Sequence, residues 1–254
     1  MPSLFDRIPL AWLFFGTIAL TALAVELGYR FGLRRKHHHP ELESSVGVLV
    51  GATLGLLAFL LAFTFGLAAT RFDERRMILL EEANAIGTMH LRTTLLEGER
   101  RERARVLIKE YVQVRLDAVD ADGLENAIRR SPGILDSLWT ISRDACLADP
   151  HSIPFGLLME SVNATIDIHS KRMQAGMRNH VPVAIWFTLY SVTLLSMLQI
   201  GYYEAVAGSR RSLAAIALWI AFSLVILLIA DLDRPQDGLM RIDQTPLREL
   251  LVTI

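Results

Sequence analysis

Two phenylalanines set four residues apart dominate the chemistry that this sequence offers. Phe59 and Phe63 lie in a long uncharged run, where Gly55, Gly66 and Thr70 continue the same spacing of three or four residues. Side chains at this spacing fall on one face of an α-helix. Repeated around an axis, the phenyl rings would form an apolar collar that gates by dewetting, with partly positive ring edges that can face an anion. The stripe can therefore line a pore.

The same run also has a purely structural interpretation. Its small residues fall on one helix face, and small residues let helices approach closely in a membrane. They are Gly51, Gly55, Ala58, Ala62 and Gly66. Arg71 follows the run, where a cation can cap helix carbonyls, extend toward the interface, or pair with Asp73 or Glu74. The residue types alone leave the pore and the packing interpretations open.

Other reactive residues predict no catalytic or metal site. The histidines His37–His39 are consecutive on a loop and cannot all face one tetrahedral ion. Cys146 is the single cysteine, so the chain has no internal disulfide and no thiolate cluster. The sequence has no phosphate-binding glycine loop, no Gly-x-Ser-x-Gly elbow and no His-Glu-x-x-His pair. We expect neither an enzyme nor a cofactor.

Four apolar runs are long enough to position such a stripe in a membrane. Each has the length that a helix needs to cross about 30 Å of hydrocarbon. The runs are Ile8–Leu27, Val46–Thr70, Val181–Tyr203 and Leu213–Ala230. Charged residues rather than a small-residue cleavage site end the first run, so we expect a retained anchor. Backbone groups must be paired in lipid, so all four runs should be helices.

A charge-dense stretch separates the spans into two hairpins. The predicted divisions are a first hairpin over 1–70, an insert over 71–180, a second hairpin over 181–230 and a tail over 231–254. Apolar residues recur at helical spacing in the insert, which predicts a folded helical unit. Its first helix should continue from the second span. Ser131 and Pro132 have the residue types of a helix start, and Asp149-Pro150 of a helix end.

Composition agrees with a membrane protein. The chain of 254 residues is 52% apolar, more than is usual for a soluble domain, and its formal net charge of −1 gives no reason to expect nucleic acid binding. Basic residues are more numerous on the side of the insert and the two termini. This bias favours a cytoplasmic location for the insert and both termini.

The second span and its exit resemble the pore helix of the bestrophin family. In that family two phenylalanines four residues apart narrow the pore, and an arginine followed by aromatics comes eight residues after the second. Phe59, Phe63, Arg71 and Phe72 keep that spacing here, and Glu74 matches an acidic residue common in bacterial members. The two hairpins around a helical insert also agree with the family.

A second resemblance follows the fourth span. The stretch from Asp231 through Asp233 and Pro235 to Gly238 is similar to the bacterial bestrophin sequence Glu-Leu-Glu-x-Pro-Phe-Gly. Its few acids do not reproduce the cluster with which animal bestrophins bind calcium, so calcium gating is not expected. Gly55 occupies the position of a third bulky neck residue in many bestrophins, which predicts a wider constriction.

The resemblance implies an all-α membrane fold and an ion channel. The channel would be a homo-oligomer in the lipid bilayer of a bacterial inner membrane, expected to have five subunits. The second span would line the pore, with a neck at Gly55, Phe59 and Phe63 and a stripe through Gly66 and Thr70. The implied permeant ions are chloride or other small anions. Two alternatives stay open: a cation channel of the same fold, and a membrane-anchored sensor or scaffold whose insert binds a partner.

Overall fold

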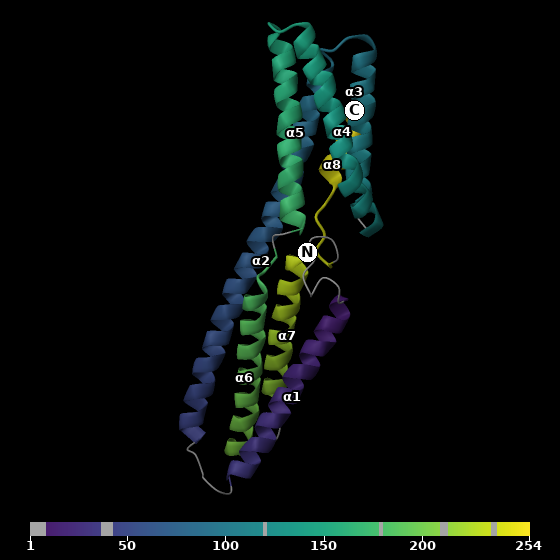
Figure 1. The fold of residues 1–254 in the computed structure, drawn as a ribbon. Coiled ribbons are helices and arrows are strands. Elements are labelled where there is room, and N and C mark those ends of the chain that lie inside the picture. Colours follow the sequence, from purple (N-terminus) through teal and green to yellow (C-terminus); the bar gives the residue numbers. More distant parts are fainter. Residues whose placement is uncertain (1–8, 37–42, 119–120, 178–179, 209–212, 235–237) are drawn as a thin grey trace. The chain divides into compact units, whose positions relative to one another are not determined.

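All regular secondary structure in the described part of the chain is α-helical. The structure is a computed structural model that describes residues 9–36, 43–118, 121–177, 180–208, 213–234 and 238–254. These residues form eight α-helices and no strand (Figure 1). The helices are α1 (Leu10–Lys36), α2 (Glu43–Thr93), α3 (Gly98–Asp117), α4 (Ala121–Ala148), α5 (Ile153–Met177), α6 (Val183–Ala207), α7 (Leu213–Asp233) and α8 (Thr245–Thr253). His37–His39 and Pro235 lie outside the described residues.

Four of these helices are long and apolar enough to cross a membrane, as predicted. The candidate spans are Leu10–Arg35, Glu43–Thr93, Val183–Ala207 and Ala215–Asp233. The chain is therefore an all-α, multi-pass membrane protein. Helix α2 has 51 residues. At about 1.5 Å per residue it is roughly 76 Å long, more than twice the roughly 30 Å of a hydrocarbon core. The expected continuation of the second span into the insert is confirmed.

The chain divides into two compact units. The membrane unit comprises Met1–Phe72 and His180–Met240, and the insert unit comprises Asp73–Asn179 and Arg241–Ile254. The C-terminal segment that was predicted as one tail is thus shared between them. Its first part belongs with the spans. Its second part, with α8, belongs with the insert, where Leu247 is buried in the apolar core.

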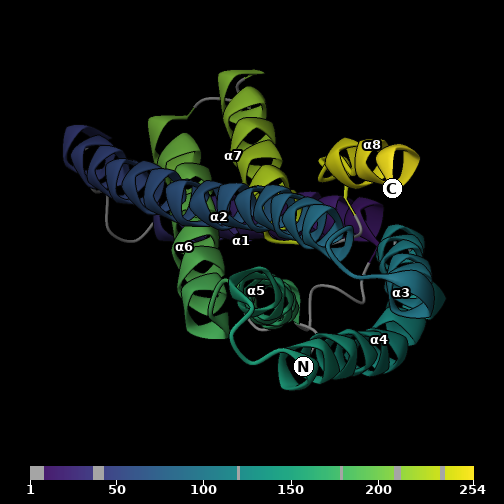
Figure 2. The same ribbon diagram turned by 90° about the horizontal axis from the view of Figure 1, so that it is seen from above.

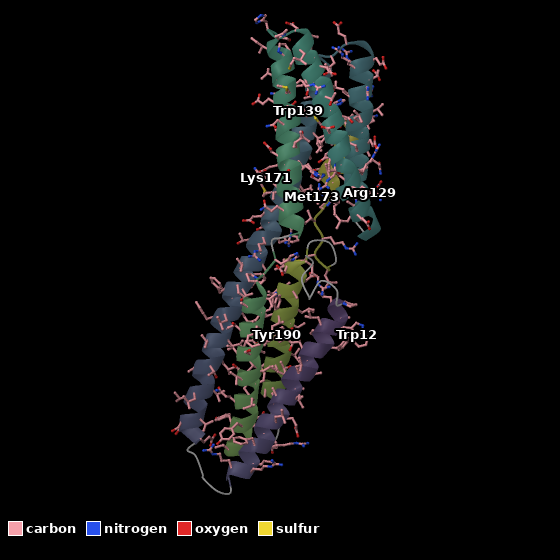
Figure 3. All side chains as sticks on the ribbon, viewed as in Figure 1. Trp12, Arg129, Trp139, Lys171, Met173 and Tyr190 are labelled. Atoms are coloured by element: carbon pink, nitrogen blue, oxygen red, sulfur yellow. The ribbon has the colours of Figure 1, made fainter. Side chains whose placement is uncertain are left out.

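Within the membrane unit, α1 packs against α6 and α7. The α1–α6 contact is close because glycines on both helices face the partner's backbone. A methyl group on Gly28 would overlap the carbonyl oxygen of Leu198, and one on Gly201 would overlap that of Val25. Tyr190, labelled in Figure 3, joins α6 to α1 through a 2.9 Å hydrogen bond between its hydroxyl and that of Thr17. Gly28 and Gly201 thus let the backbones of α1 and α6 come into contact.

Within the insert unit, α4 lies between α3 and α5 (Figure 2). These helices form an apolar core because each carries apolar residues at helical spacing, which face the neighbouring helices. On α4 the stripe includes Ala127, Ser131, Ile134 and Leu138, all buried. The prediction that a helix begins at Ser131 is wrong, because α4 begins at Ala121 and Pro132 lies inside it. The buried stripe continues on both sides of Pro132, so packing outweighs the hydrogen bond that proline cannot donate.

Candidate functional site

Helix α2 has one buried and one exposed side within the membrane unit. Leu57, Leu61 and Ala68 are buried against the other spans. On the other side the side chain of Phe59 is 66% exposed and that of Phe63 is 61% exposed. Two large aromatic residues on successive turns therefore remain uncovered by the chain itself.

The smaller residues of the predicted stripe share this exposure. Gly55, Gly66 and Thr70 are all exposed. A methyl group added to Gly55 or Gly66 would have no neighbouring atom within 4 Å outside its own helix among the residues that the structure describes. The Thr70 hydroxyl donates a hydrogen bond to the Gly66 carbonyl at 2.9 Å, so this donor is paired within the helix. The five predicted stripe residues thus form one continuous exposed face, which we call the open face of α2.

Within the described residues, the small residues that form the predicted packing face of α2 do not pack against the other helices of the subunit. Gly51, Ala58 and Ala62 are exposed as well, and a methyl group on Gly51 would also meet nothing within 4 Å. Small residues bring helices together only where a partner backbone faces them, as at Gly28 and Gly201. The open face is therefore available to lipid, to water or to another subunit.

Arg71 ends this region of α2 beside a buried aspartate. Its Nη1 lies 4.0 Å from the Oδ1 atom of Asp233 at the end of α7. The same Oδ1 accepts the backbone N–H of Val181 at 2.8 Å, just before α6. The Nδ1 atom of His180 lies 4.0 Å from the other carboxylate oxygen. Asp233 therefore links the ends of three spans. The expected partners of Arg71, Asp73 and Glu74, are exposed instead.

Asp231 is the first acid of the motif after the fourth span, and its side chain accepts hydrogen bonds from the backbone that follows α7. Its two carboxylate oxygens accept the backbone N–H groups of Leu239 at 2.7 Å and Met240 at 3.0 Å. A methyl group on Gly238 would lie 2.5 Å from Asp231 Oδ1, so glycine lets the backbone approach the carboxylate. The motif acids thus act as acceptors for backbone groups. Among the described residues, no group of three or more His, Cys, Asp or Glu is placed to hold a metal ion.

Sequence reasoning missed a buried ionic cluster in the insert unit. Glu82 on α2 contacts Arg115 and Tyr111 on α3 and Arg172 on α5. His169 on α5 completes the cluster through Tyr111. The available signal was the position of Tyr111 and His169 on otherwise apolar helix stripes, because a buried polar side chain requires a partner.

Comparison with solved structures shows a shared fold. A point variant of a bacterial bestrophin homolog from Klebsiella pneumoniae is 15% identical, with 95% of this chain and 94% of that chain covered and a TM-score of 0.65. Another structure of a bacterial bestrophin homolog from Klebsiella pneumoniae is 16% identical, with 96% and 94% covered and a TM-score of 0.62. A variant of a membrane protein is 14% identical, with 94% and 95% covered and a TM-score of 0.66.

No curated protein matches this sequence. A family model described as Bestrophin-like domain matches residues 16–247, which include all four spans in part or whole, the insert and both motifs that carried the resemblance. On this match, the chain belongs to the bestrophin-like family.

Proposed function

We propose that this chain is one subunit of an oligomeric ion channel whose pore is lined by the open face of α2. The observation that carries the proposal is the exposure of Phe59 and Phe63 on the same face as Gly55, Gly66 and Thr70. Membership in the bestrophin-like family supports it. In this arrangement, rings of Phe59 and Phe63 form an apolar neck that controls wetting of the pore.

The pore requires several copies of the chain. One subunit buries the opposite side of α2 in its own core and leaves the open face uncovered. A cyclic oligomer would bring the open faces of its subunits around one axis and so enclose a water path. Five subunits is the number that the family resemblance suggests. Helix α2 begins in the membrane unit and ends in the insert unit.

Charged side chains on the part of α2 that follows the second span affect which ion the proposed channel conducts. Glu74 and Glu81 follow Phe63 by about three and five helical turns, so they share its face of α2, and both are exposed. Arg92 lies farther along this face, but it donates to the Leu157 carbonyl. Repeated carboxylates attract cations and repel anions. We therefore favour the cation-conducting alternative over the chloride channel that the resemblance implied.

The excess of basic residues beside the insert favours a cytoplasmic insert and cytoplasmic termini. Cys146 on α4 is the single cysteine and is half-buried in the insert unit. A membrane-impermeant thiol reagent should therefore label it only after cells are permeabilised. Labelling in intact cells would contradict this orientation.

Ion flux tests the function directly. The purified chain, reconstituted in liposomes with a KCl gradient, should carry a salt-dependent current, and the sign of the reversal potential reports the preferred ion. We expect the reversal potential to move toward that of potassium. The variant Glu74→Gln/Glu81→Gln should shift it toward chloride, whereas Arg76→Gln, on another side of α2, should not. Absence of flux from intact oligomers would favour a sensor or scaffold instead.

A further inference from the structure

The interior of the insert unit holds a cluster of ionisable side chains. Glu82 is fully buried, with 0% of its surface exposed, and Tyr111 and Arg115 are also buried. His169 is buried on α5, and Arg172, one turn farther on, is half-buried. Burying charge in a protein is costly unless each group is paired and hydrogen-bonded. The contacts of these five residues therefore determine how tightly α2, α3 and α5 hold together.

A chain of hydrogen bonds connects the cluster. The Tyr111 hydroxyl donates to Glu82 Oε1 at 2.8 Å and so commits its only proton. Its oxygen lies 3.2 Å from Nδ1 of His169 and can only accept there. His169 must therefore carry a proton on Nδ1, the tautomer that this geometry selects when the ring is neutral. The Nδ1–H group of the neutral ring is then hydrogen-bonded to Tyr111, so the ring can make this contact without a positive charge.

Both arginines bind the same carboxylate. Arg115 Nε lies 3.2 Å from Glu82 Oε1, and Arg172 Nη1 contacts Glu82 Oε2. Gln244, which precedes α8, lies 3.4 Å from Arg172 Nη2 through its Oε1 atom. Two guanidinium groups thus face one carboxylate, so the cluster already has a net positive charge while His169 is neutral.

A proton on His169 would add a second positive charge to this interior. Burial is the main cause that lowers the pKa of His169 from its ordinary value of 6.5, and Arg115 and Arg172 lower it further, while Glu82 opposes them. The neighbouring Tyr111 stays protonated, because burial and Glu82 raise its pKa well above 10.0. The closed cluster therefore favours the neutral imidazole.

We propose that this cluster is an acid-operated switch, in which α5 is held against α2 and α3 at neutral pH and is released when His169 takes up a proton. The proton binds more readily once α5 has moved away, because water then reaches the ring and the guanidinium groups are farther from it. Closure is fully favoured above the pKa of the exposed ring and weakens as pH falls below about 6.5. This inference goes beyond ion conduction and does not depend on it.

The linkage sets the size of the effect. Opening that takes up one proton raises the ratio of open to closed forms by up to tenfold for each pH unit below about 6.5. Hydrogen exchange of α5 peptides from the full chain in detergent, measured by mass spectrometry at pH 7.5, 6.5 and 5.5, reports this ratio. Each rate is first corrected for the intrinsic exchange rate at that pH. We expect corrected exchange to rise on acidification.

Two variants assign the effect to His169. His169→Asn places an amide nitrogen near the position of Nδ1, where it can still donate to Tyr111 but cannot titrate. Its pH dependence should be smaller than that of the wild type by one proton. His151→Gln is the matched control, because His151 is exposed in the turn before α5. The control should keep the wild-type dependence.

The proposal is overturned by a wild type whose corrected exchange is flat between pH 7.5 and 5.5. It is equally overturned if His169→Asn keeps the full wild-type dependence. Should the asparagine variant not fold, His169→Gln provides the same comparison with another side chain that does not titrate. In every case the wild-type profile alone can contradict the switch.

Discussion

Glycine serves two different purposes in the membrane unit. At the α1–α6 contact, Gly28 and Gly201 face the partner's backbone so closely that a methyl group would overlap a carbonyl oxygen. On α2, a methyl group at Gly51, Gly55 or Gly66 would meet nothing within 4 Å beyond its own helix. The first set is used by this chain to bring two helices together. The second set has no such neighbour among the described residues.

We propose that this difference separates small residues that pack the subunit from small residues that line the pore. A glycine without a near neighbour weakens a helix by about 1 kcal/mol relative to alanine and gives no packing in return within the subunit. In the proposed channel, such a glycine on α2 faces a neighbouring subunit or the water path. The aromatic residues repeat the contrast, because Phe59 and Phe63 are exposed while Leu57 and Leu61, on the opposite side, are buried.

The largest expected effect is at the α1–α6 contact. Gly201→Val would place a branched side chain against the backbone of Val25, and backbone cannot swing aside as a side chain can. Overpacking costs about 1–3 kcal/mol where neighbouring side chains can adjust, and the cost is larger here because the neighbouring atoms are backbone. We expect loss of the folded membrane unit, measured as loss of monodisperse protein in detergent. Recovery of a stable wild-type-like species would show that the contact is looser than described.

An intermediate effect is expected on the buried side of α2. Leu57 is fully buried among the spans. Leu57→Ala should lower the free energy of unfolding in detergent by about 2–5 kcal/mol, because it removes packed atoms and leaves a cavity. Thermal unfolding of the variant beside wild type measures this. A change below about 1 kcal/mol would mean that the two sides of α2 differ less than their exposure indicates.

The smallest effect on stability is expected on the open face. Gly51→Ala places its methyl group in open space within the subunit. The unfolding free energy of the isolated subunit should stay unchanged or rise by up to about 1 kcal/mol, from helix propensity alone. Thermal unfolding checks this, with Gly28→Ala as the matched control at the close contact. A marked destabilisation by Gly51→Ala would reveal packing against that face.

The sequence predicts the helices well and their long-range partners poorly. The four spans follow from uncharged runs of sufficient length, a signal carried within each segment. Ser-Pro has the local chemistry of a helix start and so predicts a start at Ser131, whereas α4 begins at Ala121 and already buries Ala127 before that point. Local propensity is a weak indicator where a buried stripe continues.

In the candidate site, too, features within one helix were predictable and contacts between distant residues were not. The stripe from Gly55 to Thr70 depends on spacing within one helix, so its common face could be predicted, but the residue types could not show that this face is exposed. The partner of Arg71 could not, because Asp233 is close to it in space and far from it in sequence. The cluster around Glu82 likewise joins three helices through contacts between distant residues, and only the polar types of Tyr111 and His169 on apolar stripes hinted at it.

Flux through a neck variant tests the central claim that the open face of α2 lines a pore. Phe59→Ala/Phe63→Ala removes the bulky apolar walls at two successive turns, so wetting of the constriction should become easier and ion flux in liposomes should rise. Because both side chains are exposed in the subunit, its stability should change little. The matched control, Leu57→Ala/Leu61→Ala on the buried side, should instead destabilise the protein without opening a path. Unchanged flux from intact oligomers of the phenylalanine variant would contradict the account.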